Sequence, residues 1–490
     1  MIRKKQRAPR FKASRSLALP AIAGLAILIL AFELIGFAGV HSVLADFRAF
    51  WCAGSAVAHG ADPYRTAALS PCERPAAPWG LYAAPAGVVV PAPLPPYALA
   101  LFAAFSLVSF PAAAILWFAV LAACLAAAGL LLQRTLRVTP AVTALMLLLP
   151  VAVLWLPFGE VTPLALLGAA LAARGLQTER APLAVAGLIL LAFEPHLAAG
   201  AWLCVLLFAG RMRLWVAAAG ALLLAACIAV NPGALLEYAG TVLPLHALAE
   251  VPRPAQYSAT WLLDALGVPT PIALRAGAAT YVLMLAGGVA VAARLHRRWN
   301  DAAVLIFAPL AAAVVGGTFV HASQIALALP FAAMLAARER GRAAVVAALS
   351  CAVLAVPWSA SGGRQTIVLA GIGICAGLVL VLTQNRALAL RALLASIAFA
   401  ALLALADHAS AARTAVHSRT FPAAAQAQRY ASAAWGRYIW SEQSAATPAD
   451  WLGKLPAWFA LLVLAGAAVR AASNKEPVLA IRVDQAPAVP

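Results

Sequence analysis

The sequence predicts an all-α membrane protein that crosses the bilayer many times. Apolar residues make up 64% of the 490 residues and charged residues only 11%, whereas a soluble globular protein has roughly 45–50% and 25%. Runs rich in alanine and leucine recur along the whole chain, and they reach about the 20 residues that a helix needs to cross a bilayer. We therefore expect a bundle of about 12–14 transmembrane helices, with interfacial helices and loops on the external side.

The basic residues fit the loops of such a bundle. The formal charge of +18 would suggest nucleic acid in a soluble protein, but here the arginines stand in short clusters between apolar runs, and cytoplasmic loops are enriched in such residues. We expect a membrane environment and no nucleic-acid partner. With the basic amino end inside, strict alternation of crossings from residue 133 onward puts every cluster in the cytoplasm: Arg134/Arg137, Arg174/Arg180, Arg211/Arg213, Arg294/Arg297/Arg298, Arg338/Arg340/Arg342 and Arg386/Arg391.

This alternation gives one domain between two cytoplasmic tails. Residues 1–16 form a basic tail, residues 17–472 the transmembrane domain, and residues 473–490 a second tail. The apolar stretch Leu17–Val40 is too long for the core of a signal peptide, so we expect a retained first helix in which Glu33 pairs within the bundle or snorkels. The long external loops are then 41–92, 231–268 and 408–455.

One segment does not fit the alternation. Residues 93–132 hold two apolar segments where the count of crossings allows one. The first, residues 93–110, begins with the prolines of Pro91-Ala-Pro-Leu-Pro-Pro96, which disfavour a regular helix. We therefore predict that residues 93–110 are a re-entrant or interfacial element that does not span the bilayer.

The first external loop carries a carboxylate close to the membrane surface. Asp46 follows the first helix directly, and the aromatic residues after it, Phe47, Phe50 and Trp51, suit a short helix in the bilayer interface. The sequence Gly60-Ala-Asp-Pro-Tyr64 then predicts a turn. Such a position is where a lipid-linked substrate presents its head group.

The seven cysteines show no spacing typical of a metal site or of a disulfide framework. Five of them lie in apolar runs, where cysteine behaves as a small hydrophobic residue. Cys52 and Cys72 fall in one external loop and are the pair that can form a disulfide; two free thiols are the alternative.

Further polar residues fall at external helix ends or loops. Glu160 and Glu194 stand beside Gly or Pro at breaks between apolar runs, and His196, Arg253 and His321 are external or nearly so. Ionisable groups at such depths are candidates for a functional site. Each also has a structural explanation. Asp46, Glu160 and Glu194 can be solvated helix ends, Asp62 a turn residue before Pro63, and His321 a helix cap.

Several of these motifs together resemble a known enzyme family. The chain resembles family 87 of the glycosyltransferases, integral membrane enzymes of the GT-C fold typified by mannosyltransferases that use polyprenyl-phosphate-mannose to make α-1,2 links. The likeness covers roughly the first 210 residues by motif and the rest by hydropathy. Its motifs are Asp46-Phe-Arg-Ala-Phe-Trp51, Gly60-Ala-Asp-Pro-Tyr64, Leu94-Pro95-Pro96, Gly159-Glu160-Val-Thr-Pro163 and Glu194-Pro195-His196-Leu197.

The resemblance implies a function as well as a GT-C-like bundle. It implies transfer of a hexose such as mannose, or a pentose, from a polyprenyl-phosphate donor to a lipid or glycan acceptor on the external face of a bacterial inner membrane. The aspartate that serves as general base in the family corresponds to Asp46. The chain departs from the family pattern at Leu94, where tyrosine is usual, at Glu160, where glutamine is usual, and at Glu194, where lysine is usual.

Such a transfer needs few polar groups. A polyprenyl-phosphate leaving group is already activated, so a base and groups that hold the phosphate suffice. Asp46 is the expected base. The expected substrate-binding residues are Arg48, Asp62, Glu160, Glu194, His196, Arg253 and His321. No cofactor is expected, and a divalent metal is optional. The sequence contains no glycine-rich phosphate-binding loop that would indicate a nucleotide-sugar donor.

Two other classes of protein remain open at this stage. Intramembrane acids and broken helices are also typical of transporters and flippases, although the acids here gather at one face and no internal repeat is found. A non-catalytic protein with the same fold is the third class, because Glu160 and Glu194 put carboxylates where the family has neutral or cationic side chains.

Overall fold

The chain folds as an all-α protein in the described ranges. The computed structural model describes residues 44–73, 88–360, 365–411, 419–422, 424–442 and 446–474. Within these ranges the regular structure is helical, with two isolated β-bridges and no strand. The expected first helix Leu17–Val40, the tail 1–16 and residues 475–490 lie outside the described residues.

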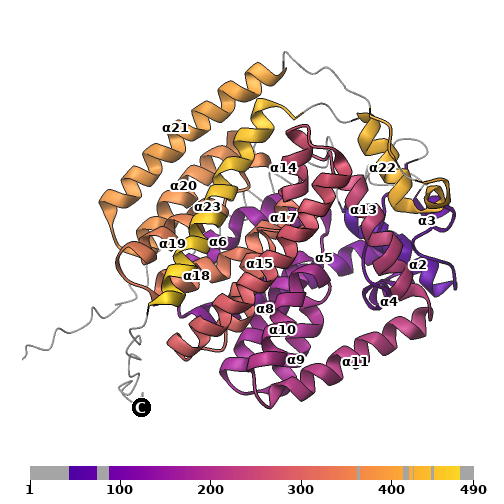
Figure 1. Cartoon of the computed structure of the whole chain (residues 1–490), viewed down its shortest axis with the longest axis horizontal. Helices are drawn as coiled ribbons and strands as arrows, with labels where there is room; N and C mark the ends of the chain where they lie inside the picture. The colour runs from indigo at the N-terminus through magenta and orange to yellow at the C-terminus, as the bar shows by residue number, and fades with distance from the viewer. Residues whose placement is uncertain are drawn as a thin grey trace, which may run out of the picture.

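Seven helices among the described residues are long and apolar enough to cross a membrane. They are α5 (Phe110–Leu136), the run of α6 (Pro140–Leu149), η1 (Pro150–Trp155) and α7 (Leu156–Phe158), α11 (Met212–Val230), α15 (Thr270–Trp299), α20 (Gln365–Thr383), α21 (Arg386–Ala411) and α23 (Pro448–Ser473). Figure 1 shows α15, α23, α20 and α21 side by side. The chain is an all-α polytopic membrane protein, as the sequence predicts.

Shorter helices fill the centre of the bundle. Nearly every residue is buried in α16 (Val304–Ala313), which contains Pro309, and in α18 (Leu329–Arg338), which contains Pro330. This is expected for helices that are apolar all round. The shorter helices here are α8 (Thr162–Gln177), α9 (Ala181–Leu191), α10 (Pro195–Phe208), α16 (Val304–Ala313), α17 (Ala322–Ile325), η3 (Ala326–Ala328), α18 (Leu329–Arg338) and α19 (Gly341–Leu354).

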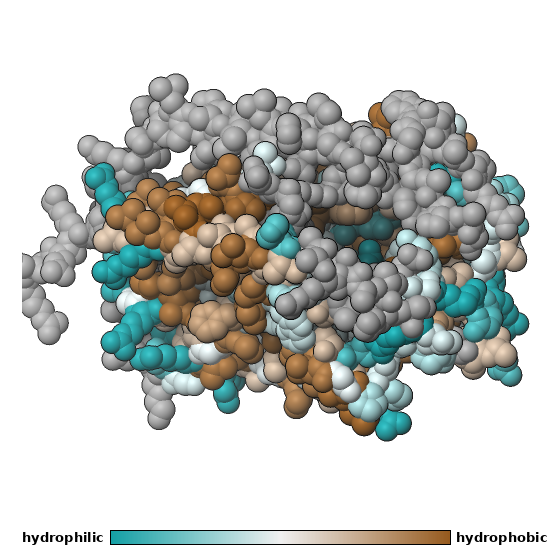
Figure 2. Space-filling view, turned by 90° about the horizontal axis from the view of Figure 1, so that it is seen from above, coloured by the Kyte–Doolittle hydropathy of each residue, from teal (hydrophilic) through white to brown (hydrophobic). Residues whose placement is uncertain are grey.

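The remaining helices lie mainly at one end of the molecule. Figure 1 shows α2, α3, α4, α13 and α22 gathered there. The helices of this group and its neighbours are α2 (Ala45–Ala58), α3 (Thr66–Glu73), α4 (Pro96–Phe105), α12 (Ala234–Glu237), η2 (Tyr238–Val242), α13 (Leu243–Glu250), α14 (Ala259–Ala265), η4 (Trp358–Ala360), η5 (Ala425–Arg429) and α22 (Ala431–Glu442). The visible face in Figure 2 has an apolar band with hydrophilic residues toward both ends.

Arginine-bearing helix ends meet at one end of the bundle, which we call the arginine pole. Arg298 pairs with Glu339 at 2.6 Å and donates to the carbonyl of Ala471, while Asp301 pairs with Arg338. Asp301 also accepts a hydrogen bond from Gln177, whose amide reaches the carbonyl of Thr135 as well. The carboxyl ends of α5, α8, α15, α18 and α23 therefore lie together. Four of the predicted cytoplasmic clusters thus share one side, as the alternation requires.

The opposite end carries the other termini of these helices. The 30-residue helix α15 is about 45 Å long, which exceeds the roughly 30 Å of a hydrocarbon core. Its first turn lies beside Asp264, which accepts a hydrogen bond from Thr270 and pairs with Arg419. Residues of the predicted external loops 231–268 and 408–455 therefore meet at this end, which we call the cavity pole.

The segment 93–110 does not form a full spanning helix. Its helix, α4, has ten residues and a length of about 15 Å, half of a hydrocarbon core. Both ends of the segment lie near the first loop, because the carbonyl of Leu94 accepts a hydrogen bond from Tyr64 and that of Phe105 from Trp51. The short helix that the prolines predict is confirmed, and the re-entrant or interfacial position of the segment stays a prediction.

The first loop forms the predicted short helix, α2, with a different role for its aromatic side chains. Phe47 and Phe50 are buried. Phe47 stacks on Trp117 of α5 at 5.4 Å between ring centroids. The backbone of Phe102 lies so close to α2 that a Cβ at Gly54 would be 2.3 Å from it. Phe47 and Phe50 therefore fix α2 onto α4 and α5 instead of anchoring it in lipid, and a disulfide between Cys52 and Cys72 joins α2 to α3.

Candidate active site

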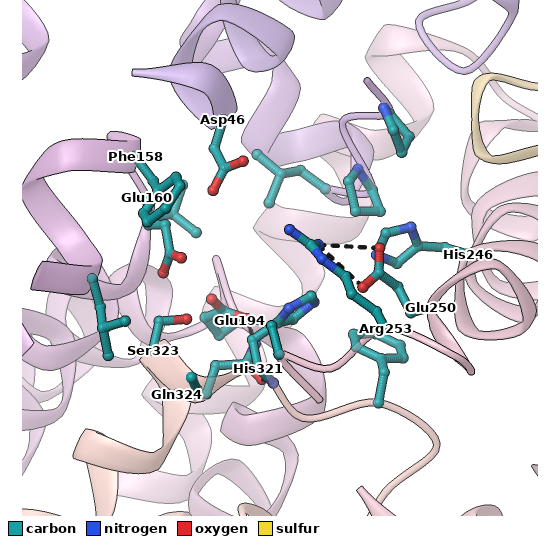
Figure 3. A pocket seen from close by; sticks show the side chains of 18 of the residues that line it. Asp46, Phe158, Glu160, Glu194, His246, Glu250, Arg253, His321, Ser323 and Gln324 are labelled. Atoms are coloured by element: carbon teal, nitrogen blue, oxygen red, sulfur yellow. Dashed lines mark hydrogen bonds and ion pairs between the residues drawn. The ribbon is translucent and has the colours of Figure 1, made fainter. Parts of the chain in front are cut away.

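A cavity of about 500 Å³ lies at the cavity pole, where helix ends and loops meet. Six of the eight predicted site residues line it: Asp46, Glu160, Glu194, His196, Arg253 and His321. Figure 3 shows how the side chains labelled there gather around the cavity from α2, from the turn between α7 and α8, from the residue before α10, from α13 and the loop after it, and from the start of α17. The volume lies within the roughly 300–1,000 Å³ of small-molecule sites.

Asp46 stands in the first turn of α2. The preceding residue, Leu44, adopts a left-handed conformation with φ of 60° and donates its N–H to the carbonyl of Pro157 at 2.6 Å. Gly159 has φ of +69°, and a Cβ there would be 2.8 Å from the Cβ of Phe47. The close approach of α7 to α2 therefore needs glycine at 159, and it fixes the position of Asp46.

The surroundings of Asp46 suit a general base. Burial raises the pKa of its carboxyl from 3.8 to about 6, the positive charge of Arg253 opposes this rise, and the negative charge of Glu250 adds to it. With this pKa, Asp46 is ionised near neutral pH and still basic enough to accept a proton. That combination suits a general base, which works best when its pKa is near the working pH.

Glu160 and Glu194 lie in the same cavity and have neutral hydrogen-bond partners. Thr162 donates its hydroxyl to Glu160 at 3.1 Å, and Gln324 donates its amide to Glu194 at 2.9 Å. Burial raises the pKa of Glu160, as does the negative charge of Asp46. Burial also raises the pKa of Glu194 to about 7. Glu194 therefore exchanges its proton near neutral pH.

Arg253 extends into the cavity from an ion pair with Glu250, at 3.1 Å (Figure 3). Glu250 is 1% exposed and also accepts hydrogen bonds from Gln256 at 3.0 Å and from Trp435 at 2.7 Å. Burial acts to raise the pKa of Glu250, but the positive charge of Arg253, two neighbouring histidines and the hydrogen bond from Trp435 together outweigh it and hold the pKa well below its usual range. The pair keeps a permanent cation in the cavity.

The loop that carries Arg253 is joined to the loop before α17. Gln256 and His321 form an isolated bridge, and the amide of Gln256 lies 3.2 Å from Nδ1 of His321. The N–H of His321 donates to the side chain of Gln324 at 3.0 Å, so His321 is both a helix cap and a lining residue. Burial lowers its pKa to about 3, which makes it a neutral hydrogen-bonding group.

Two further histidines surround the ring of Phe319. The centroids of His196 and His246 lie 5.1 Å and 5.4 Å from that of Phe319. Nε2 of His196 and Nδ1 of His246 are buried and have no hydrogen-bond partner among the described residues. Buried nitrogen atoms of this kind are normally paired, so these two are available to a bound polar group.

Two predicted site residues lie away from the cavity. Arg48 donates to the carbonyl of Glu73 at 2.8 Å and lies over the ring of Phe110. It stands two residues after Asp46 in the same helix, so the two side chains lie on different faces of that helix. Asp62 accepts a hydrogen bond from the N–H of Tyr64 and pairs with Arg65 at 2.6 Å. The structural explanation holds for Asp62, which shapes the turn, and Arg48 is a packing residue.

Several residues of the site were missed by the sequence argument. Glu250 lies three residues before Arg253 on a predicted external segment, and this i, i+3 spacing brings side chains together in a helical turn; that pattern could have identified it. The hydrogen bonds of Gln256 and Trp435 to Glu250 and of Gln324 to Glu194 span 6 to 185 residues, so no local pattern could have identified them.

The described part of the chain contains no group of three or more His, Cys, Asp or Glu residues placed to hold a metal ion. Comparison of the chain with family models, with curated proteins and with solved structures gave no match. The interpretation of the site therefore rests on its own geometry and chemistry.

Proposed function

We propose that this protein is a membrane glycosyltransferase that takes a sugar from a polyprenyl-phosphate donor. The observation that supports this most is the pairing of groups in one cavity, where the basic carboxylate of Asp46 faces the fixed cation of Arg253 (Figure 3). Transfer of a glycosyl group from a phosphate needs one group of each kind. The sequence motifs that resemble those of glycosyltransferase family 87, a family with the GT-C fold, agree with this choice.

In the proposed reaction Asp46 accepts the proton of an acceptor hydroxyl. The acceptor oxygen attacks the anomeric carbon of the sugar while the bond from that carbon to the phosphate oxygen breaks. The electron pair of this bond goes to the phosphate, which leaves as polyprenyl phosphate, and the configuration at the anomeric carbon is inverted. Arg253 neutralises the charge that develops on the leaving oxygen, and His321 and His196 add neutral hydrogen bonds.

The charge of the cavity favours a donor with a single phosphate. Among the described residues that line it, Arg253 is the one arginine or lysine, whereas the acids are Asp46, Glu160, Glu194, Glu250 and Asp450. A lipid diphosphate would bring a second negative charge close to these carboxylates, and repulsion between like charges disfavours that. A monophosphate beside Arg253 leaves the acids to accept hydrogen bonds from sugar hydroxyls.

We place the reaction on the external face of a bacterial inner membrane. The arginine pole would face the cytoplasm by the positive-inside rule, so the cavity would open outward. The disulfide between Cys52 and Cys72 agrees with an oxidising compartment. The acceptor would be a lipid or a glycan, and the sugar a hexose such as mannose or a pentose.

Purified protein in lipid nanodiscs tests this function. We expect it to release polyprenyl phosphate from polyprenyl-phosphate-mannose or polyprenyl-phosphate-arabinose when membrane lipids and glycans of a deletion strain are supplied as acceptors. The transporter alternative is tested in parallel with the same lipids in sealed vesicles. Movement of intact donor across the bilayer without any release of polyprenyl phosphate would replace the transferase by a flippase.

A further inference from the structure

The cation of the site is held by a side chain from the last quarter of the chain. Trp435 of α22 lines the cavity, and its indole N–H donates to Glu250 at 2.7 Å. Its ring also faces the guanidinium of Arg253, whose Cζ lies 5.5 Å from the ring centroid. One side chain therefore contacts both members of the ion pair.

These two contacts constrain the ion pair from one side. A carboxylate has two oxygens, and in Glu250 one of them accepts from Trp435 and the other from Gln256. The carboxylate cannot rotate without losing one of these hydrogen bonds, and hydrogen bonds to a buried charge are among the stronger ones. Arg253 follows Glu250 because both carboxylate oxygens accept from its Nη1.

The backbone after Arg253 is fixed independently. Lys454 of α23 donates to the carbonyl of Pro254 at 2.5 Å, and the N–H of Tyr257 donates to the carbonyl of Val320 at 2.7 Å. Loss of Trp435 would therefore release the ion pair together with the turn from Glu250 to Arg253, while the backbone from Pro254 onward stays in place.

We propose, on the basis of the proposed transferase function, that Trp435 is a positioning residue for the donor phosphate. It orients Glu250, and through Glu250 it aims the guanidinium of Arg253 at the phosphate. Trp435 touches the ion pair and not the reacting atoms, so its removal weakens donor binding more than it slows the chemical step. The segment that carries α22 thus completes a site whose base comes from α2, about 390 residues earlier in the chain.

A matched control is available on the same helix. Trp440 also packs α22 onto α13, and its indole N–H donates to the carbonyl of Leu248 at 3.2 Å. Trp435→Phe and Trp440→Phe each remove one indole hydrogen bond between the same two helices and keep an aromatic ring. They differ in the acceptor, since Trp435 serves the ion pair and Trp440 a backbone carbonyl.

Steady-state kinetics with polyprenyl-phosphate sugar separates the two roles. We expect Trp435→Phe to raise KM for the donor roughly threefold to tenfold, as loss of one charge-assisted hydrogen bond implies, with kcat within about twofold of the parent. Trp440→Phe should leave KM within about twofold. Equal changes in KM for the two variants would overturn the positioning role.

A double-mutant cycle tests whether Trp435 acts through Glu250. Glu250→Gln already removes the ion pair. In that background Trp435→Phe should raise KM by less than about a further twofold, because the effects of substitutions within one network are not additive. A full additional effect of Trp435→Phe on Glu250→Gln would contradict the proposal.

Hydrogen exchange keeps this inference separate from the proposed function. Peptides that cover residues 250–257 should exchange faster in Trp435→Phe than in Trp440→Phe, whatever reaction the protein catalyses. If the parent protein releases no polyprenyl phosphate, the transferase function fails, and the exchange measurement still decides whether Trp435 holds the ion pair. Equal exchange in the two variants would overturn the positioning role even in an active enzyme.

Discussion

Asp46 is distinguished at the residue scale by its surroundings and not by its type. Asp46 and Asp62 are both acids of the first loop, but Asp46 faces the cavity while Asp62 pairs with Arg65 and caps a turn. Burial raises the pKa of Asp46 to about 6, whereas Asp62 interacts with a neighbouring cation. The two carboxylates therefore give a direct comparison of the proposed base with a turn residue.

Asp46→Asn should lower the transfer rate by roughly 10²–10⁴-fold, because the amide keeps the shape and cannot accept the proton. Asp62→Asn should lower it by less than about threefold, since a partly exposed ion pair contributes only about 0.2–1 kcal/mol. Release of polyprenyl phosphate by the two purified variants is the measurement, with protein level and monodispersity as controls. An active Asp46→Asn protein would remove Asp46 as the base.

The pH dependence should report the same carboxyl group. As the proposed base, Asp46 would be active when ionised, so kcat/KM should fall as the pH decreases through about 6, the raised pKa of this group. The positive charge of Arg253 lowers that pKa, so Arg253→Gln should move the acidic limb of the profile to higher pH. If the acidic limb is unchanged in Arg253→Gln, or moves to lower pH, it does not report the titration of Asp46.

The cysteines give a test that needs no activity. Five of the seven cysteines are buried and free, and Cys52 and Cys72 form a disulfide. Alkylation of unfolded, unreduced protein should therefore label five cysteines, and alkylation after reduction all seven, as intact mass shows. Seven labels without reduction would mean that α2 and α3 are not joined.

At the element scale, the position of α2 depends on its close contact with the end of α7. Gly159 and Gly60 both have φ of +69°, but a Cβ at Gly159 would meet Phe47 at 2.8 Å while a Cβ at Gly60 would meet nothing within 4 Å. The same substitution at the two positions therefore has the same backbone strain and differs in steric contact.

Gly60→Ala should reduce stability by about 1 kcal/mol, the usual cost of a left-handed residue other than glycine. Gly159→Ala should cost about 1–3 kcal/mol more, because its Cβ overpacks the start of α2, and it should lower transfer by displacing Asp46. Thermal unfolding and transfer rates of both variants are the measurement. If Gly159→Ala matched Gly60→Ala in both, the contact between α7 and α2 would not position the base.

Elements that a local sequence pattern determines could be predicted from the sequence. Long apolar runs predict long helices, and the prolines before α4 predict a short one. The sequence also puts Asp46 at the start of an aromatic segment, and that residue lines the cavity; its role as the base stays a prediction. The position of Arg48 could not be predicted, since the side of a helix that faces a cavity depends on packing, here against α4 and α5. Trp435 was out of reach because its contact with Glu250 joins segments 185 residues apart.

At the scale of the whole molecule, the two poles make a prediction about sidedness. Exposed residues are available at each pole, since Gln426 lies in η5 near the cavity pole and Arg340 follows α18 at the arginine pole. The bundle between them is crossed by α15, whose length of about 45 Å exceeds the hydrocarbon core. A reagent that cannot cross the membrane therefore reaches the two residues from opposite sides.

Gln426→Cys should react with a membrane-impermeant maleimide in intact cells, and Arg340→Cys only after lysis. The positive-inside rule predicts that the arginine pole faces the cytoplasm, and the buried native thiols give little background in the folded protein. The parent protein without either substitution is the control. Labelling of Arg340→Cys in intact cells, with Gln426→Cys labelled only after lysis, would reverse the orientation. The cavity would then open to the cytoplasm, and the proposed external acceptor would have to be replaced by a cytoplasmic one.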